Sequence, residues 1–185
     1  MNLILASASP RRRELLATLG IPFSVRTSTA EELREGPWMM LALENALRKA
    51  EEVAARFPED LVIGADTVIE FENRILGKPE NMDDAFRMLS IFSGKTHCVT
   101  TGCAIICHSR SIRIRFAETS RVTFKSLDAE TIRRYLSLVP VLDKAGAYAI
   151  QDHGEMLIES LEGSLDNVIG FPTDRFRLPL KFLLN

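Results

Sequence analysis

Apolar positions along the chain follow two spacings, and these spacings predict the elements of the fold. Apolar or alternating runs, which are typical of strands, occupy residues 2–6, 23–27, 61–71, 97–107 and 112–124, with another around 155–163. Apolar residues three or four positions apart predict helices over about 10–19, 37–57, 82–93 and 128–139, with a short terminal helix from about 174. Central strands that alternate with helices predict an α/β or α+β fold.

The ends of these helices carry their own signals. Three helices are predicted to begin at capping residues: Ser9, Asn81 and Asp128. Two are predicted to stop at glycines: Gly20 and Gly94. The apolar face of the longest helix is predicted to contain Met40, Leu43, Leu47 and Ala50. Pro179 disfavours the terminal helix.

The composition limits the classes of partner. Hydrophobic residues make up 46% of the 185 residues and charged residues 26%, which suits one domain, residues 1–185, with a real core. The net charge of −2 provides no basic field, so neither nucleic acid nor a membrane surface is an expected partner. No segment approaches the ~20 apolar residues of a transmembrane helix, and the first residues do not resemble a signal peptide.

The three cysteines, Cys98, Cys103 and Cys107, lie close together in a predicted strand. Their spacing, even with His108, matches no zinc motif. We therefore expect structural cysteines of a core, and a cytoplasmic protein.

The stretch "SASPRRREL" places three arginines where a helix begins. A cation in the first turn is disfavoured by roughly 0.3–1 kcal/mol, because the helix dipole is already positive there. A solvated charged face is one interpretation. The other is a polyphosphate site, in which Ser7, backbone N–H groups and the guanidinium groups of Arg11 and Arg12 bind the anion. The position of the run, directly after a strand and a serine-rich turn, favours the second interpretation.

Asp66 interrupts the apolar run "VIGADTVI", where an unpaired carboxylate is costly to bury. It is interpreted either as half of a structural salt bridge or as a carboxylate that binds a hard cation or activates water.

Five other polar residues can be interpreted either as ordinary surface residues or as residues of a functional site. Glu31 and Glu32 resemble surface acids, and Lys49 resembles a solvated helix residue. Lys78 lies between Gly77 and Pro79, a break that leaves one cation projecting. Gln151 ends "DKAGAYAIQ", whose small residues allow the chain to pass close to another group.

Six motifs together resemble the Maf family of nucleoside triphosphate pyrophosphatases. They are "LASASPRRRELL", "GADTVI", "GKP", "SGKTHCVTTG", "DKAGAYAIQ" and "NVIGFP", in the family's order and over nearly the whole chain. The resemblance implies an elongated, mixed-sheet α/β fold with a cleft between two closely packed lobes. It also implies a cytoplasmic homodimer that cleaves a nucleoside triphosphate between its α and β phosphates with a divalent cation, Mg²⁺ or Mn²⁺.

The resemblance also implies roles for individual residues. Ser7, Arg11, Arg12, Lys49 and Lys78 bind the substrate and its phosphates. Glu32, with Glu31 as the alternative, and Asp66 bind the metal. Asp66 is the proton acceptor for the attacking water. The residues that select the base are Arg12, Thr67 and Gln151.

The motifs resemble the branch that acts on dTTP and UTP more than the branch that acts on 7-methyl-GTP. The chain has Ala149 and Asp152 where family members usually have glycine, and both flank the base-recognition segment, so CTP and modified pyrimidine nucleotides are further candidate substrates. Two other classes stay open. One is a nucleotide-binding regulator without activity, and the other is a single-stranded nucleic-acid binder, which the lack of aromatic residues in "SPRRREL" disfavours.

Overall fold

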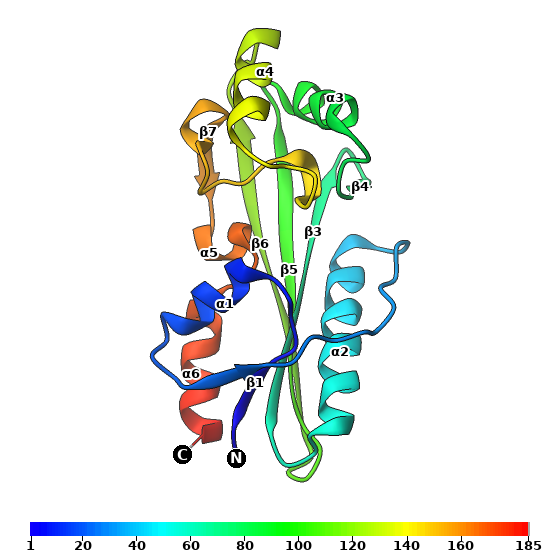
Figure 1. Cartoon of the computed structure of the whole chain (residues 1–185), viewed down its shortest axis with the longest axis vertical. Helices are drawn as coiled ribbons and strands as arrows, with labels where there is room; N and C mark the ends of the chain where they lie inside the picture. Colours follow the sequence, from blue (N-terminus) through cyan, green and yellow to red (C-terminus); the bar gives the residue numbers. More distant parts are fainter. Residues whose placement is uncertain (185) are drawn as a thin grey trace. The chain divides into compact units, whose positions relative to one another are not determined.

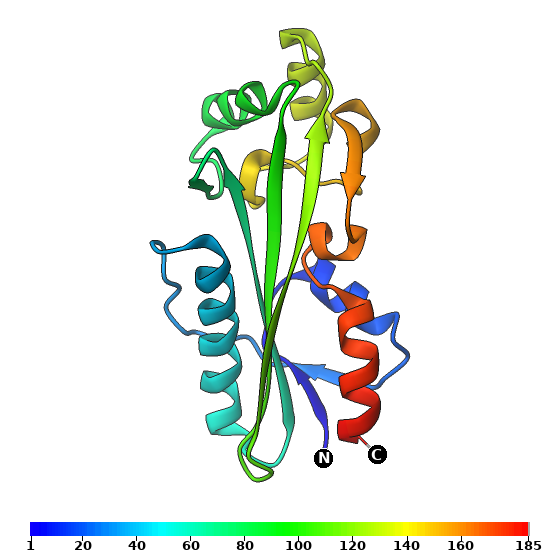
Figure 2. The same ribbon diagram turned by 180° about the vertical axis from the view of Figure 1, so that it is seen from behind.

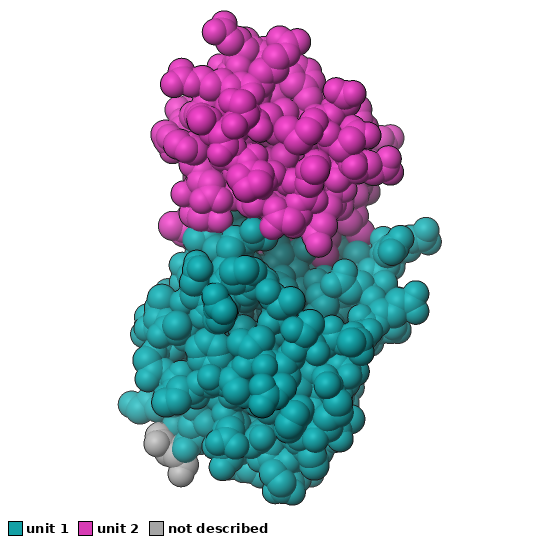
Figure 3. Space-filling view, viewed as in Figure 1, with its two compact units in different colours: residues 1–67, 100–118, 166–185 teal, residues 68–99, 119–165 magenta. Residues whose placement is uncertain are grey.

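The computed structural model describes residues 1–184. Contacts divide the chain into two compact units, which Figure 3 colours separately. Unit 1 comprises the described residues of Met1–Thr67, Thr100–Glu118 and Asp166–Asn185, and unit 2 comprises Val68–Val99 and Thr119–Leu165. The prediction of a single domain of two closely packed lobes concerns how the units are joined, and it stays a prediction.

A mixed sheet of seven strands forms the framework, in the order β2-β1-β3-β5-β6-β7, with β4 paired to β3 (Figure 1). The strands are β1 (Leu3–Leu5), β2 (Phe23–Val25), β3 (Leu61–Phe71), β4 (Arg74–Leu76), β5 (Thr96–Cys107), β6 (Ile112–Phe124) and β7 (Ile158–Glu162). β1 is parallel to both β2 and β3, whereas β3 and β4, like β6 and β7, are antiparallel. The predicted α/β class is therefore confirmed.

Unit 1 has helices on both faces of its part of the sheet, as Figures 1 and 2 show. The helix α2 (Trp38–Arg56) covers one face, and α1 (Pro10–Ala17) and α6 (Thr173–Leu184) cover the other. Alternate strand residues serve the two sides: Leu3, Leu5, Leu61 and Ile63 pack with residues of α1 and α6, whereas Ile4 and Val62 pack with residues of α2. Strands buried on both faces explain why the sequence reads as continuous apolar runs.

Glycine and alanine residues bring α2 unusually close to the sheet. A Cβ atom at Gly64 on β3 would lie 2.2 Å from the carbonyl oxygen of Ala46, and one at Gly102 on β5 would lie 2.3 Å from that of Ala42. Ala42, Ala46 and Ala50 supply the small helix face that this approach needs. This close approach lets the polar side chains of Asn45 and Lys49 on α2 contact Asp66 on β3.

We expect Gly64→Ala to lower the free energy of unfolding by about 1–3 kcal/mol or more, because either the helix or the strand must move to admit the methyl group. Urea denaturation followed by circular dichroism measures the change. Gly77→Ala is the matched control, since nothing lies within 4 Å of a Cβ atom there. Equal stability of the two variants would contradict the close helix–sheet contact.

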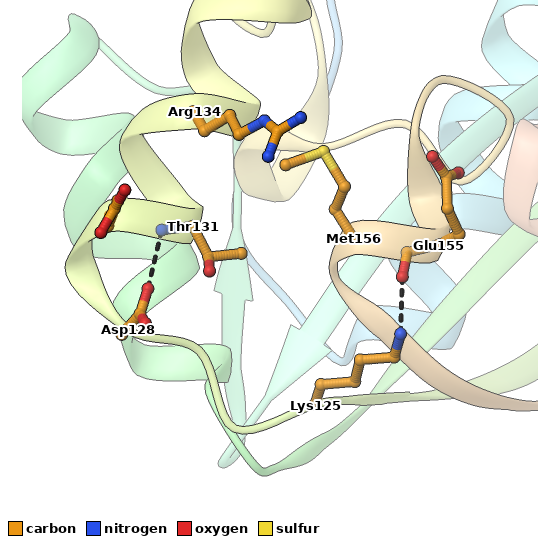
Figure 4. Close-up of a pocket in the computed structure, with 7 residues that line it drawn as sticks. Lys125, Asp128, Thr131, Arg134, Glu155 and Met156 are labelled. Atoms are coloured by element: carbon orange, nitrogen blue, oxygen red, sulfur yellow. Dashed lines mark hydrogen bonds between the residues drawn. The ribbon is translucent and has the colours of Figure 1, made fainter.

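Unit 2 packs the helices α3 (Met82–Phe92) and α4 (Ala129–Leu138) against each other. The capping residues predicted for them, Asn81 and Asp128, accept hydrogen bonds from backbone N–H groups of the first turn. A hollow of about 310 Å³ lies beside α4 and is lined by Lys125, Asp128, Glu130, Thr131, Arg134, Glu155 and Met156 (Figure 4). None of the predicted site residues lines this hollow.

An aromatic cluster surrounds His97 in the core of unit 2. The imidazole stacks on Phe92 with 4.2 Å between ring centroids, and its Nε2 lies 2.8 Å from the hydroxyl of Tyr148. Burial lowers the pKa of His97 to about 3, so the ring is neutral at physiological pH. His97 thus has a structural role, with Tyr148 as its hydrogen-bond partner.

His97 makes the stability of the protein depend on pH. Between pH of about 6.5 and 3 the unfolded chain binds a proton at this imidazole that the folded chain does not bind. The free energy of unfolding therefore falls as the pH is lowered through this window, by at most ~1.4 kcal/mol per pH unit. We expect His97→Phe to reduce this slope in denaturation curves from pH 7 to 4. His108→Gln, which removes an exposed imidazole, is the control, and an unchanged slope in His97→Phe would contradict the assignment.

The 143–154 segment is irregular, with two short 3-10 turns at Ala145–Ala147 and Gly154–Met156. Gly146 has φ of +69°, and a Cβ atom there would lie 2.8 Å from the side chain of Ile69. The small residues therefore let this segment pass close to the core of unit 2.

Three features of the fold differ from the sequence predictions. Met40 is exposed rather than part of the buried face of α2, which instead includes Leu41, Ala42 and Asn45. The strand β4 was not predicted; it follows a two-residue turn in which Glu72 and Asn73 both have positive φ. The helix α5 (Leu165–Ile169) was also missed, because it is shorter than two turns. The predicted terminal helix is confirmed as α6, which forms in spite of Pro179.

Cys103 and Cys107 are buried in the core of unit 1 as free thiols, as predicted, and Cys98 is half-buried in unit 2. Within residues 1–184, no helix combines the length and apolar character that crossing a membrane requires.

Candidate active site

The turn between β1 and α1 arranges the serine side chains around the start of the helix. Ser9 caps the helix, and its Oγ accepts a hydrogen bond from the backbone N–H of Arg12 at 3.4 Å. Ser7 Oγ accepts one from the N–H of Ser9 at 3.2 Å. The predicted cap is therefore confirmed. The backbone N–H groups of Ser9 and Arg12 therefore already donate to serine hydroxyls. A phosphate bound at this turn would depend more on side-chain cations.

Arg12 connects three distant parts of unit 1. Its Nε donates to the carbonyl oxygen of Gly170 at 3.0 Å, and its Nη2 donates to Thr67 Oγ1 at 3.0 Å. Nη1 lies 3.5 Å from Ser7 Oγ. Gly170 allows this approach, because a Cβ atom there would lie 3.2 Å from Thr67 Oγ1. The side chain is thus fixed before any ligand binds.

Burial lowers the pKa of Arg12, and the Asp66 carboxylate offsets part of that effect. The same interaction shows that Arg12 and Asp66 share one electrostatic environment. Arg11 on the same helix turn acts in the opposite sense and lowers the pKa of Arg12 further. Arg11 is half-buried, and Arg13 is exposed.

Asp66, Lys49 and Glu32 form the second part of the site. Lys49 Nζ on α2 lies 2.7 Å from Asp66 Oδ1 on β3 and 2.5 Å from Glu32 Oε1 in the loop before α2. The side chains of Lys49 and Asp66 are only 13% and 12% exposed, so Lys49 is not the solvated residue that its helix position suggested. Glu32 is the acid of the Glu31–Glu32 pair that contacts Lys49. A structural salt bridge would need only the pair of Asp66 and Lys49, whereas Lys49 also contacts the carboxylate of Glu32.

Asn45 is a site residue that the sequence analysis missed. Its Oδ1 accepts from the backbone N–H of Leu33 at 2.7 Å, and its Nδ2 donates to the Leu33 carbonyl at 3.0 Å and to Asp66 Oδ2 at 3.1 Å. It therefore ties the loop that carries Glu32 to the strand that carries Asp66. The available signal was a polar residue one helical turn before Lys49, between apolar positions of α2.

Lys78 and Gln151 belong to unit 2, and both are exposed. Lys78 lies between β4 and α3. Gln151 lies in the irregular segment, where its Nε2 donates to Asp152 Oδ2 at 3.3 Å. Asp152, which departs from the family pattern, therefore contacts the side-chain amide of Gln151, the predicted base-recognition residue.

The donor set at Asp66 and Glu32 fits a hard divalent cation. Two carboxylates converge on one position, and the ammonium group of Lys49 at that position shows that it accommodates positive charge. Within the described part of the chain, no group of three or more His, Cys, Asp or Glu side chains converges as a metal site. Mg²⁺ is commonly bound by one or two carboxylates, with phosphate oxygens and water as the other ligands. The two carboxylates match that pattern.

Comparison with known proteins relates the whole chain to one family. The sequence model described as Maf-like protein matches residues 2–182. A protein of Akkermansia muciniphila named dTTP/UTP pyrophosphatase is 50% identical over 171 residues, which cover 91% of this chain and 89% of the relative. A protein of the same name from Alkaliphilus oremlandii is 44% identical, over 97% of this chain and 95% of the relative.

Among solved structures, the Ham1 protein of Staphylococcus aureus matches with a TM-score of 0.59 at 15% sequence identity. The match covers 99% of this chain and 100% of that one. At this identity the likeness concerns the fold, and it agrees with the α/β class.

Proposed function

Because the chain belongs to the Maf family, we propose that it hydrolyses the α–β phosphate bond of dTTP and UTP to give the nucleoside monophosphate and pyrophosphate. Relatives that share 44–50% of its residues carry the name dTTP/UTP pyrophosphatase. The observation that best supports the proposal is the convergence of Glu32, Lys49 and Asp66. These residues come from a loop, a helix and a strand that are separate in the sequence.

Asp66 is suited to activate a water molecule. Its two oxygens accept hydrogen bonds from Lys49 and Asn45, which fix the carboxylate in one orientation. Each carboxylate oxygen can accept a second hydrogen bond, so the group keeps acceptor capacity for a water. That water donates its proton to Asp66 as it attacks the α phosphorus in line, and pyrophosphate is the leaving group.

The cations of the site neutralise the triphosphate. We assign this role to Arg11, Arg12 and Lys49, with the Ser7 hydroxyl as a further ligand of phosphate, and the family resemblance assigns it to Lys78 as well. Arginine binds phosphate oxygens through paired N–H donors. Arg12, Thr67 and Gln151 select the base.

Glu32 and Asp66 would hold the divalent cation, Mg²⁺ or Mn²⁺. When bound, the cation neutralises negative charge on the phosphate oxygens during the reaction. In the absence of nucleotide, Lys49 keeps the two carboxylates together.

A nucleotide panel tests the proposal. The protein is incubated with dTTP, UTP, CTP and 7-methyl-GTP in Mg²⁺, in Mn²⁺ or in EDTA, and the products are separated. We expect monophosphate and pyrophosphate from dTTP and UTP, with activity that EDTA removes. Binding without turnover would favour a regulator, and nucleoside diphosphate with inorganic phosphate would overturn the bond assignment. Preferential turnover of 7-methyl-GTP would assign the chain to the other branch.

The family resemblance also supports a cytoplasmic homodimer. Light scattering of the purified protein and fractionation of the source cells test these two proposals, and a monomer or a membrane-bound pool would contradict them.

A further inference from the structure

A series of hydrogen bonds in unit 1 leads from Arg12 through two threonine hydroxyl groups to a buried backbone carbonyl. Arg12 Nη2 is 3.0 Å from Thr67 Oγ1, and Thr67 Oγ1 is 3.0 Å from Thr101 Oγ1. Thr101 Oγ1 is in turn 3.0 Å from the carbonyl oxygen of Asn167. Thr101 and Asn167 are completely buried, whereas Thr67 is half-buried.

The chemistry of the two ends determines the direction of every hydrogen bond between them. A guanidinium N–H can only donate, so Thr67 Oγ1 accepts from Arg12. A backbone carbonyl can only accept, so the single hydroxyl hydrogen of Thr101 goes to Asn167. Thr101 Oγ1 must then accept from Thr67, whose only hydroxyl hydrogen points into the protein.

This direction limits what Thr67 can offer a ligand. With its hydrogen committed to Thr101 and one lone pair bound by Arg12, the hydroxyl has one lone pair left. The three side-chain bonds of Arg12 use three of its five N–H groups, so donors remain beside that lone pair. Together the two side chains present hydrogen-bond donors next to an acceptor.

The edges of the pyrimidine bases differ in this pattern. Uracil and thymine carry a carbonyl oxygen at position 4 and an N–H at position 3, which complement a donor and an acceptor. Cytosine carries an amino group at position 4 and an unprotonated nitrogen at position 3. The amino group of cytosine would then face the N–H donors of Arg12, and its position-3 nitrogen would face the acceptor lone pair of Thr67.

We propose that Thr101 is a specificity-determining positioning residue, which holds Thr67 as a pure acceptor and so favours uracil and thymine over cytosine. The proposal rests on the proposed function, in which Arg12 and Thr67 face the base. Thr101 is 0% exposed, so it acts through Thr67 and not by touching the nucleotide.

Variants of Thr101 test the proposal through the ratio of kcat/KM for UTP to kcat/KM for CTP. Thr101→Val removes the acceptor while keeping the shape, and Thr67 can then turn its hydrogen toward the ligand. We expect the UTP/CTP ratio to fall about tenfold or more. Thr101→Ser keeps the hydroxyl and should keep the ratio. If the role of Thr101 were purely structural, Thr101→Val would lower kcat/KM for UTP and for CTP by the same factor and leave their ratio unchanged.

A double variant separates a direct effect from one through Thr67. In a Thr67→Val background the acceptor is already lost, so adding Thr101→Val should leave the UTP/CTP ratio unchanged. A further fall in the ratio would show that Thr101 acts by another route and would overturn the proposal.

The wild-type protein provides a test that does not depend on variants folding. In 3-deaza-UTP the base is a 4-hydroxy-2-pyridone of almost the same size as uracil, so it has lost both the N–H at position 3 and the carbonyl at position 4. We expect its kcat/KM to be at least about tenfold below that of UTP. Equal values would overturn the proposal and leave the pyrophosphatase activity standing. Absence of pyrophosphate release from every nucleotide would instead overturn the proposed function.

Discussion

Asp66→Asn should lower kcat for dTTP hydrolysis by about 10²–10⁴-fold, the range that a positioned general base contributes. The carboxamide cannot accept the proton of the attacking water, and it offers a metal ion a neutral oxygen in place of an anionic one. Its NH₂ group would also face the ammonium group of Lys49 or the amide of Asn45, both of which donate to the present carboxylate. Steady-state rates of pyrophosphate release measure the loss.

Glu70→Gln is the matched control for this variant. Glu70 lies on the same strand, outside the Glu32–Lys49–Asp66 cluster, and the substitution keeps the oxygen that accepts from the Asn73 N–H. We expect near wild-type turnover from it. Wild-type turnover in a folded Asp66→Asn variant would remove Asp66 from the mechanism.

Lys49→Gln should lower kcat/KM for dTTP by about 10²–10³-fold, the cost of losing one preorganised donor in a site where charge develops. Without the ammonium group, Glu32 and Asp66 face each other as two anions, and the triphosphate meets two negative charges with one fewer cation.

Arg48→Gln removes a cation from the neighbouring position on α2. Arg48 pairs with Glu44 at 3.9 Å, and both side chains are well exposed, so this loss should leave kcat/KM nearly unchanged. Equal effects of the two variants would show that general surface charge, and not the Lys49 position, supports the activity.

The fold was predictable where one signal dominated a segment. Strands buried on both faces read as continuous apolar runs, and capping side chains marked the starts of α1, α3 and α4. The face of α2 was predicted only in part, because the helix packs through small residues. Alanines at 42 and 46 carry little hydrophobic signal, whereas the exposed Met40 carries a strong one.

The candidate site was visible in the sequence where a residue conflicted with its surroundings. Asp66 stands out within an apolar strand, and Arg11 and Arg12 stand out at a helix start. Thr101 gave no such signal, and Asn45 gave only a weak one as a polar residue between apolar positions of α2. Their roles depend on distances to Asp66 and Thr67, which only the folded chain reveals.

The most direct test of the account is to run the reaction in water labelled with ¹⁸O and to weigh both products of dTTP. Attack of an Asp66-activated water at the α phosphorus predicts one ¹⁸O atom in the nucleoside monophosphate and none in pyrophosphate. Label in pyrophosphate, or release of nucleoside diphosphate and labelled inorganic phosphate, would contradict it.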